Sequence, residues 1–235
     1  MAARKDQRKP KPMTPRVTVL QLDTDFPRIP GDVGAVETYS TPPQIIRIAG
    51  ASVGKIVIDR PEDIDITPFA DALAQAEGDV IATSCGFLAF WQDHLAALTD
   101  RPFVASSLIA LDGLSDTLSP EELMILTFDE SALGTAHLRG HDDYSASILG
   151  LAPQMHLRQV ISQNQGRLNP TLAGQEIVSL VATQITKAHK HILLECTNLP
   201  PYRRALQQVT GLPVTDILSV IEETCPNAIA PAFIS

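Results

Sequence analysis

Two cysteines occupy equivalent positions in two similar segments of the chain. The segments read IATSCGFLAFWQDHLAALTDRPF from Ile81 and ILLECTNLPPYRRALQQVTGLPV from Ile192, and they align without a gap at an offset of 111 residues. Cys85 in the first segment therefore matches Cys196 in the second. Each copy has an apolar strand that runs into the cysteine, then a helix, a proline and a further strand. This pattern indicates one supersecondary unit that is used twice.

The position of each cysteine predicts a reactive thiol. Cys85 and Cys196 are expected at the carboxyl end of a strand and just before a helix, where open α/β sheets bind ligands. The free N–H groups and partial positive charge of a helix N-terminus favour the thiolate and lower the pKa of a thiol. Cys225 lies beside Pro226 and has no partner in the repeat, so we expect a structural role for it.

Two thiols that face each other suit acid/base chemistry at one carbon atom. One thiolate removes a proton, and the opposite thiol delivers another from the far side, which inverts the carbon. The carbanion between them is stabilised by N–H groups and hydroxyls around an adjacent carboxylate. The residues beside the two cysteines are the candidates to bind that carboxylate: Ser84, Gly86, Phe87, Thr197 and Asn198. No lysine lies in a context that implies pyridoxal phosphate, and we expect no cofactor.

Strand-like and helix-like segments alternate along the chain, which indicates an α/β fold. Strands are expected at residues 17–22, 45–48, 80–83, 103–106, 123–127 and 191–194. Helices are expected at residues 68–76, 86–98, 131–139, 157–160, 172–189 and 200–210, and residues 214–222 close the chain. Together with the repeat, this order predicts two similar parallel-sheet lobes related by a pseudo-two-fold axis, with the active-site cleft between them.

The domain organisation follows from the same reading. We expect the first lobe at residues 16–115 together with 212–235, and the second at 116–211. Residues 1–15 are basic and contain prolines, which indicates a disordered tail. The loop at residues 23–34 reads DTDFPRIPGDVG and is long for a connection after a strand, and such loops are often functional.

Composition excludes several classes of protein. Of the 235 residues, 44% are hydrophobic and 19% are charged, which predicts a folded core. A net charge of −9 and 5% aromatic residues argue against a nucleic-acid partner. No apolar run reaches the roughly 18 residues that cross a bilayer, no secretory signal is evident, and three cysteines are too few for a disulfide framework. We therefore expect a cytoplasmic protein without membrane contact. Because Gly140 separates His137 from His141, no metal site is expected there.

The motifs TSCGF at 83–87 and ECTNLP at 195–200 resemble the two cysteine signatures of the aspartate/glutamate racemase superfamily. That superfamily also includes hydantoin racemases, maleate isomerases and arylmalonate decarboxylases, and the resemblance spans nearly the whole chain after the tail. It implies a cofactor-independent isomerase, a racemase or epimerase acting at the carbon alpha to the carboxylate of an amino acid such as aspartate or glutamate, or of a derivative. Because related enzymes are often dimers, it also implies a homodimer.

The resemblance implies roles for individual residues. Cys85 and Cys196 would be the two acid/base groups, and the residues beside them, together with Thr127, would bind the substrate carboxylate. Asp23 occupies the place of an acidic residue that would meet the substrate amino group.

Two departures argue against a plain glutamate racemase. Glutamate racemases typically have Asn-Thr where this chain has Gly86 and Phe87, and a histidine where it has Asn198. Alternatives on the same scaffold are a maleate-type cis–trans isomerase and an arylmalonate-type decarboxylase. A non-catalytic carboxylate-binding or thiol redox protein is a further alternative. The presence of both cysteines favours two-sided proton transfer, since the decarboxylases keep only one.

Overall fold

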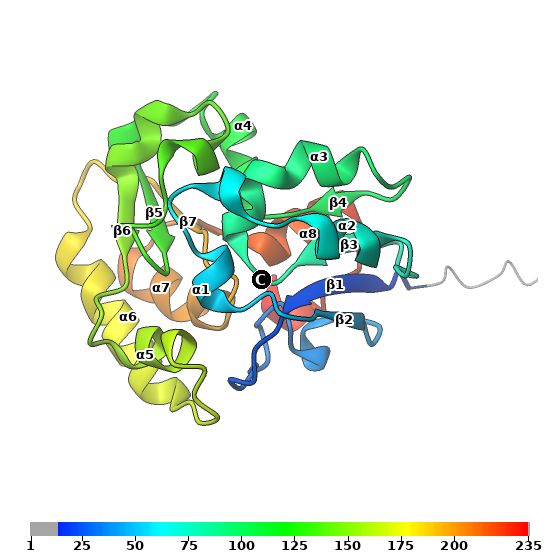
Figure 1. Ribbon diagram of the computed structural model, residues 1–235. Helices are drawn as coiled ribbons and strands as arrows, with labels where there is room; N and C mark the ends of the chain where they lie inside the picture. The colour runs from blue at the N-terminus through cyan, green and yellow to red at the C-terminus, as the bar shows by residue number, and fades with distance from the viewer. Residues whose placement is uncertain (1–13, 235) are drawn as a thin grey trace, which may run out of the picture.

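The computed structural model describes residues 14–234 and contains two four-stranded parallel sheets (Figure 1). The first sheet has the order β2-β1-β3-β4 and the second the order β6-β5-β7-β8. The strands are β1 Val17–Leu22, β2 Gln44–Ile48, β3 Val80–Thr83, β4 Phe103–Val104, β5 Leu123–Thr127, β6 Ile148–Gly150, β7 His191–Leu194 and β8 Val214–Thr215. The two sheets thus repeat one topology, and the prediction of an α/β fold with two similar lobes is confirmed.

Helices cover the faces of the two sheets. The α-helices are α1 Val53–Ile56, α2 Thr67–Leu73, α3 Gln92–Ala96, α4 Leu111–Leu114, α5 His156–Ser162, α6 Pro170–Gln184, α7 Arg203–Thr210 and α8 Ile217–Thr224. The 3-10 helices are η1 Val36–Thr38, η2 Pro61–Asp63, η3 Gly86–Trp91, η4 Ser107–Ala110, η5 Pro120–Glu122, η6 Thr135–Leu138, η7 Asp142–Ser147, η8 Pro200–Tyr202 and η9 Pro231–Phe233. No helix within residues 14–234 has the length and apolar character to span a membrane.

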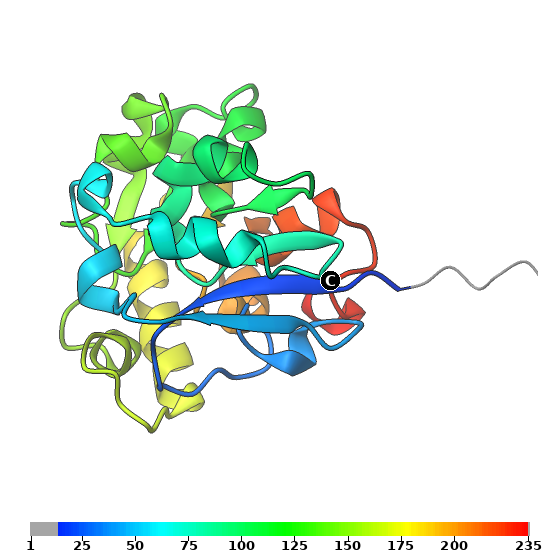
Figure 2. The ribbon, with the colours of Figure 1, turned by 45° about the vertical axis from the view of Figure 1, so that its right-hand side comes forward.

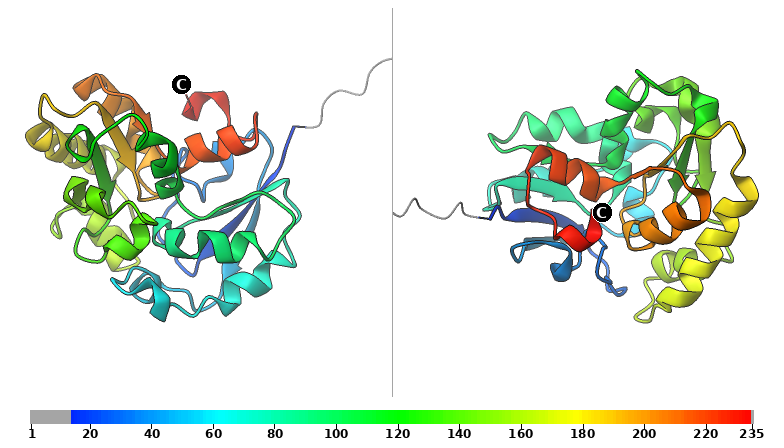
Figure 3. Two further views of the ribbon diagram at one scale, coloured as in Figure 1. Left: turned by 90° about the horizontal axis from the view of Figure 1, so that it is seen from above. Right: turned by 180° about the vertical axis from the view of Figure 1, so that it is seen from behind.

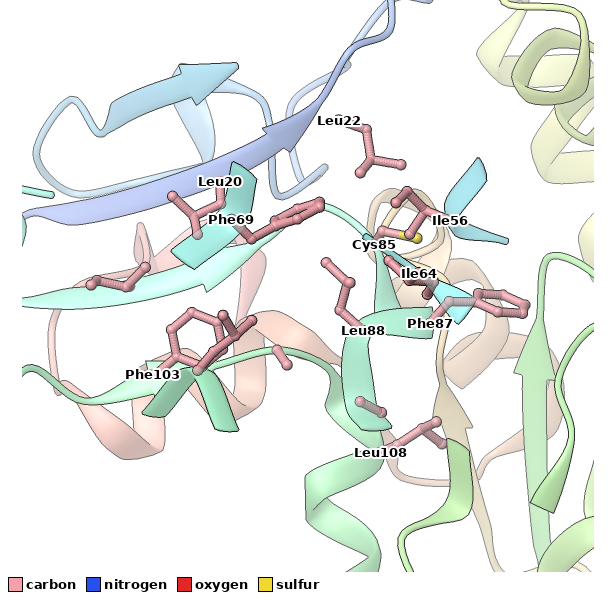
Figure 4. Close-up of a cluster of buried hydrophobic side chains, with 14 of the residues drawn as sticks. Leu20, Leu22, Ile56, Ile64, Phe69, Cys85, Phe87, Leu88, Phe103 and Leu108 are labelled. Atoms are coloured by element: carbon pink, nitrogen blue, oxygen red, sulfur yellow. The ribbon is translucent and has the colours of Figure 1, made fainter. Parts of the chain in front are cut away.

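The central strands are apolar because both of their faces are covered. All residues of β3 and β5 are buried, and so are five of the six residues of β1. In the first lobe, Leu20, Phe69, Leu88 and Phe103 belong to one buried cluster, and Cys85 lies at its edge, where β3 has ended (Figure 4). The core therefore holds the end of β3, and with it the first cysteine, in a fixed position.

Several elements differ from the expectation. The helix expected at 131–139 is reduced to the short η6, because Gly134 and the left-handed Arg139 (φ 54°) bound it. The helix expected at 172–189 is α6, which ends at Gln184. β6 was not predicted, since three residues carry too little pattern to indicate a strand.

The chain returns to the first lobe at its C-terminal end. Helix α8 packs with Val17, Val19 and Val80 of the first sheet, and the views in Figure 2 and Figure 3 place it on that lobe. β8 pairs with β7 in the second sheet, although residues 212–235 were all expected in the first lobe. The return therefore begins at α8. The basic tail expected at 1–15 lies almost wholly outside the described residues.

The backbone donors around the two cysteines repeat at the same offset of 111 residues. The Ser84 amide donates to the Leu20 carbonyl at 3.0 Å, and the equivalent Glu195 amide donates to the Leu126 carbonyl at 2.9 Å. After the cysteines, Leu88 and Leu199 donate to the carbonyls of Cys85 and Cys196 at 3.2 and 3.0 Å. The repeat seen in the sequence is thus a repeat of backbone geometry.

Candidate active site

A pocket lies between the two lobes and contains both cysteines. Its cavity volume is about 30 Å³. The first lobe lines it with Leu22, Phe26, Arg28, Val53, Val57, Ser84, Cys85, Gly86 and Phe87, and the second with Phe128, Ile161, Glu195, Cys196, Thr197 and Asn198. Seven of the nine residues proposed from the sequence are therefore brought together here.

The two cysteines have equivalent surroundings. The backbone N–H group of Phe87 lowers the pKa of Cys85, and the backbone N–H group of Asn198 lowers that of Cys196. These two donors are again 111 residues apart. Each sulfur thus sits at the first turn of the segment that follows its strand, and the N–H group would favour a thiolate.

Burial nevertheless outweighs these donors. It raises the pKa of Cys85 to about 12, with Glu195 adding to the rise and Arg28 opposing it. The pKa of Cys196 is raised well above its usual value by burial and by the charge of Glu195. The expected lowering of both pKa values by a helix N-terminus is therefore wrong, because the cost of removing a thiolate from water exceeds the effect of one N–H group.

Ser84 and Thr197 join the lobes beside the cysteines. The Thr197 hydroxyl donates to the Ser84 carbonyl at 2.7 Å, across the boundary between the lobes. The Ser84 hydroxyl accepts from the amide of Leu22 at 2.9 Å. These bonds fix the two cysteine segments relative to each other, and any role of the hydroxyls in carboxylate binding stays a prediction.

Asp23 and Thr127 do not line the pocket. The Asp23 carboxylate accepts from Arg47 at 2.5 Å and from the Gly50 amide at 2.9 Å, and both contacts lower its pKa. Thr127 is buried behind the pocket, where its hydroxyl donates to Glu195 Oε2 at 2.6 Å. Their proposed contacts with substrate stay predictions, although the geometry gives each residue another partner.

Glu195 is a site residue that the sequence analysis did not single out. Its side chain is fully buried and lines the pocket, and burial raises its pKa from 4.5 to about 7. The signal was available in the repeat, because Glu195 aligns with Ser84 and places a carboxyl where the first copy has a hydroxyl. An acidic side chain is rarely fully buried, so a glutamate directly after strand β7 indicates a functional role.

The long first loop crosses to the second lobe. Asp32 is buried and accepts from the Asn198 side chain at 2.5 Å and from Arg28 at 3.2 Å. The Asn198 amide oxygen is in turn 3.8 Å from the Cys196 sulfur, which donates to it. The expectation that this loop is functional gains support, since it contributes Phe26 and Arg28 to the pocket and fixes Asn198 beside the second cysteine.

Within residues 14–234, no group of three or more histidine, cysteine or acidic side chains is arranged to hold a metal ion. The arrangement of two thiols and one carboxyl in an apolar pocket suits proton transfer to and from a carbon atom.

The fold is that of known racemases and of a decarboxylase. Allantoin racemase from Pseudomonas fluorescens superposes with a TM-score of 0.55, at 13% identity over 94% of this chain and 96% of that one. The Picrophilus torridus aspartate racemase gives 0.53 at 10% identity, over 93% and 97% of the chains. Unliganded arylmalonate decarboxylase gives 0.51 at 14% identity, over 94% and 97%. The chain thus has the fold of these two racemases and of the decarboxylase, which is the kind of fold that the resemblance implied.

The curated proteins that are similar in sequence are named as lyases, and not as racemases or decarboxylases. A dimethylsulfoniopropionate lyase from Durusdinium sp. clade D is 26% identical over 240 residues, which cover 92% of this chain and 78% of the relative. Dimethylsulfoniopropionate lyases 5 and 7 from Emiliania huxleyi are each 25% identical, over 89% and 87% of this chain. The chain spans 44% and 64% of the length of these two relatives. No family model matches the chain.

Proposed function

We propose that the protein is a lyase that removes the α-proton of a carboxylate and expels a leaving group from the β-carbon, with dimethylsulfoniopropionate as its substrate. The observation that carries the proposal is that Cys85 and Cys196 share one pocket, each with a backbone N–H group on its sulfur. The names of the sequence relatives support the choice of leaving group.

The reaction begins as a racemase reaction does, with removal of a proton next to a carboxylate. A cysteine thiolate takes the proton from the α-carbon, and the electron pair of that C–H bond forms a double bond to the β-carbon. The bond from the β-carbon to the sulfonium sulfur breaks, and dimethyl sulfide leaves with its electron pair. Acrylate remains, and the thiol returns its proton to solvent.

We assign the base to Cys85. Arg28 acts on this thiol and opposes the rise of its pKa, whereas the pKa of Cys196 is raised further by Asp32. A substrate that brings a positive charge into the pocket would lower the pKa of the thiol further. Ser84, Gly86, Phe87, Thr197 and Asn198 border the two sulfurs and are the candidates to bind the carboxylate.

Racemisation of an amino acid or related carboxylate is the second candidate. It is favoured by the equivalence of the two cysteines, because two-sided proton transfer needs a competent group on each face of the carbon. Elimination needs only one base. The two candidates therefore differ in product and not in the first step.

The test is to incubate the reduced protein with dimethylsulfoniopropionate and to measure dimethyl sulfide by gas chromatography and acrylate by NMR. We expect both products in equal amounts. Cys85→Ser should lower the rate by about 100-fold or more, whereas Cys196→Ser should lower it by much less, because elimination needs only one base. Cys225→Ser is the matched control, since Cys225 lies outside the pocket and should keep the full rate.

A parallel incubation in heavy water with amino acids, hydantoins and diacids tests the second candidate. Exchange of an α-proton with appearance of both enantiomers, and no dimethyl sulfide from the sulfonium substrate, would replace the lyase by a racemase. Full activity in Cys85→Ser would refute the assignment of the base.

A further inference from the structure

Two charged side chains face the pocket with one atom each that has no hydrogen-bond partner. Among the described residues that line it, Arg28 and Glu195 are the two with charged side chains. Arg28 Nε and Glu195 Oε1 are buried and unpartnered within residues 14–234. Buried polar atoms are normally paired, so a donor and an acceptor left over in one small pocket indicate a ligand that supplies both partners.

Glu195 is the negative pole of the pocket. Thr127 holds its Oε2, and Gly86 makes room for its Oε1, since a Cβ on Gly86 would overlap that oxygen. The equivalent position in the other lobe holds Ser84, so the carboxyl breaks the symmetry of an otherwise repeated site. Proton transfer by two cysteines does not require this asymmetry.

Arg28 is the positive pole. Its side chain is 9% exposed, and its two terminal nitrogens donate to Asp32 and to the Thr24 hydroxyl, each at 3.2 Å. The guanidinium lies 4.4 Å from the centre of the Phe26 ring, which fixes its plane. With both terminal nitrogens held in this way, Nε remains for a carboxylate oxygen, to which an arginine N–H group donates well.

The aromatic side chains offer less to a cation than Glu195 does. Arg28 covers one face of Phe26, and Arg158 lies 4.1 Å from the ring centre of Phe128. Phe87 packs edge-to-face against His137. A cation in the pocket therefore finds its opposite charge on the Glu195 carboxylate.

Resting on the function proposed above, we infer that Arg28 and Glu195 are the two poles of a zwitterion site. Arg28 binds the substrate carboxylate, and Glu195 pairs with a cationic group on the β-carbon. The enzyme would thus select carboxylates with a positive leaving group over carboxylates of the same shape that lack a positive charge. Glu195 is then a specificity-determining residue and takes no proton from the substrate.

The electrostatics of the pocket agree with this assignment. Burial holds the pKa of Glu195 at about 7, the Thr127 hydroxyl opposes the rise, and the Glu195 charge acts on both cysteine thiols. A cationic ligand would favour the ionised carboxyl and lower this pKa. Binding of the sulfonium ligand near neutral pH should therefore release protons, and a carboxylate without a cationic group should not cause that release.

The experiment compares two ligands of nearly the same shape. Dimethylsulfoniopropionate carries S⁺ where 4-methylpentanoate carries CH, and both have the carboxylate. Their affinities are measured by calorimetry on the Cys85→Ser protein, in which the sulfonium persists. We expect a preference for the sulfonium of about tenfold or more, because one charge pair is formed in a dry pocket. Adding Glu195→Gln should reduce the preference to about threefold or less.

Arg28→Gln provides the complementary variant. It should weaken both ligands by a similar factor and keep the preference, since both carry the carboxylate that Arg28 binds. Proton release is read from calorimetry of the Cys85→Ser protein in two buffers of different ionisation enthalpy. This measurement needs no substitution at Glu195, so it remains decisive if Glu195→Gln fails to fold.

The outcomes separate the inference from the proposed lyase activity. Four outcomes refute the inference, even if the wild type releases dimethyl sulfide. They are a preference that survives Glu195→Gln, equal affinities for the two ligands, binding of neither ligand, and no proton release. A preference that depends on Glu195 in a protein that releases no dimethyl sulfide supports the zwitterion site and refutes the lyase.

Discussion

Replacing Glu195 by glutamine should remove a pH-dependent loss of stability. Burial raises the pKa of this carboxyl from 4.5 to about 7, so the unfolded chain releases the proton at lower pH than the folded protein does. The contribution of Glu195 to the free energy of unfolding is therefore fully present below about pH 4.5 and is lost as the pH rises to about 7. The difference between the two pKa values corresponds to about 3 kcal/mol.

The assay is urea unfolding of the wild type and of Glu195→Gln at about pH 5 and about pH 8. Because other groups also titrate, the quantity of interest is the difference between the two proteins. Glu195→Gln should gain about 3 kcal/mol relative to wild type between the two pH values. Glu37→Gln removes the same charge from an exposed side chain and is the control. Parallel pH profiles for wild type and Glu195→Gln would refute the burial argument.

Two further predictions concern the neighbours of Glu195. Gly86→Ala should lower the free energy of unfolding by about 2 kcal/mol or more, because the added Cβ would overlap Glu195 and would lie 2.8 Å from its Cδ. Gly54→Ala, which meets no atom within 4 Å, is the control in the same urea assay, and equal stabilities would contradict the packing. Thr127→Val removes the hydroxyl that lowers the pKa of Glu195, so the carboxyl should titrate at higher pH. An infrared titration of the carboxyl band that shows no upward shift would count against this contact.

The lobes and the two cysteines could be predicted from the sequence because the repeat is local. A strand, a cysteine and a turn recur at a fixed offset, and the backbone around Cys85 and Cys196 recurs with them. Strands β1, β3, β5 and β7 were found since each is a short, mainly apolar run. These features depend on residues that are close together in the chain, so they can be recognised from the sequence without the tertiary structure.

The charge state of the site could not be predicted in the same way. The sequence places each cysteine before a helical turn, which favours a thiolate, but the pKa of Cys85 is set by how deeply the two lobes bury it. The contact of Asp32 with Asn198 joins residues 166 positions apart. Burial and contacts of this range arise only when the lobes close on each other, so no local pattern carries them.

The remaining asymmetry indicates what kind of substrate the pocket suits. A racemase has to present equivalent groups to both faces of one carbon, and the sulfurs with their N–H donors meet that demand. The aligned pairs Ser84 with Glu195 and Phe87 with Asn198 do not, because one lobe adds a carboxyl and an amide where the other has a hydroxyl and a ring. A substrate with opposite charges at its two ends uses such a difference, and a β-sulfonium carboxylate and an amino acid both have opposite charges. The pocket is therefore symmetric for moving a proton and polar for holding a zwitterion.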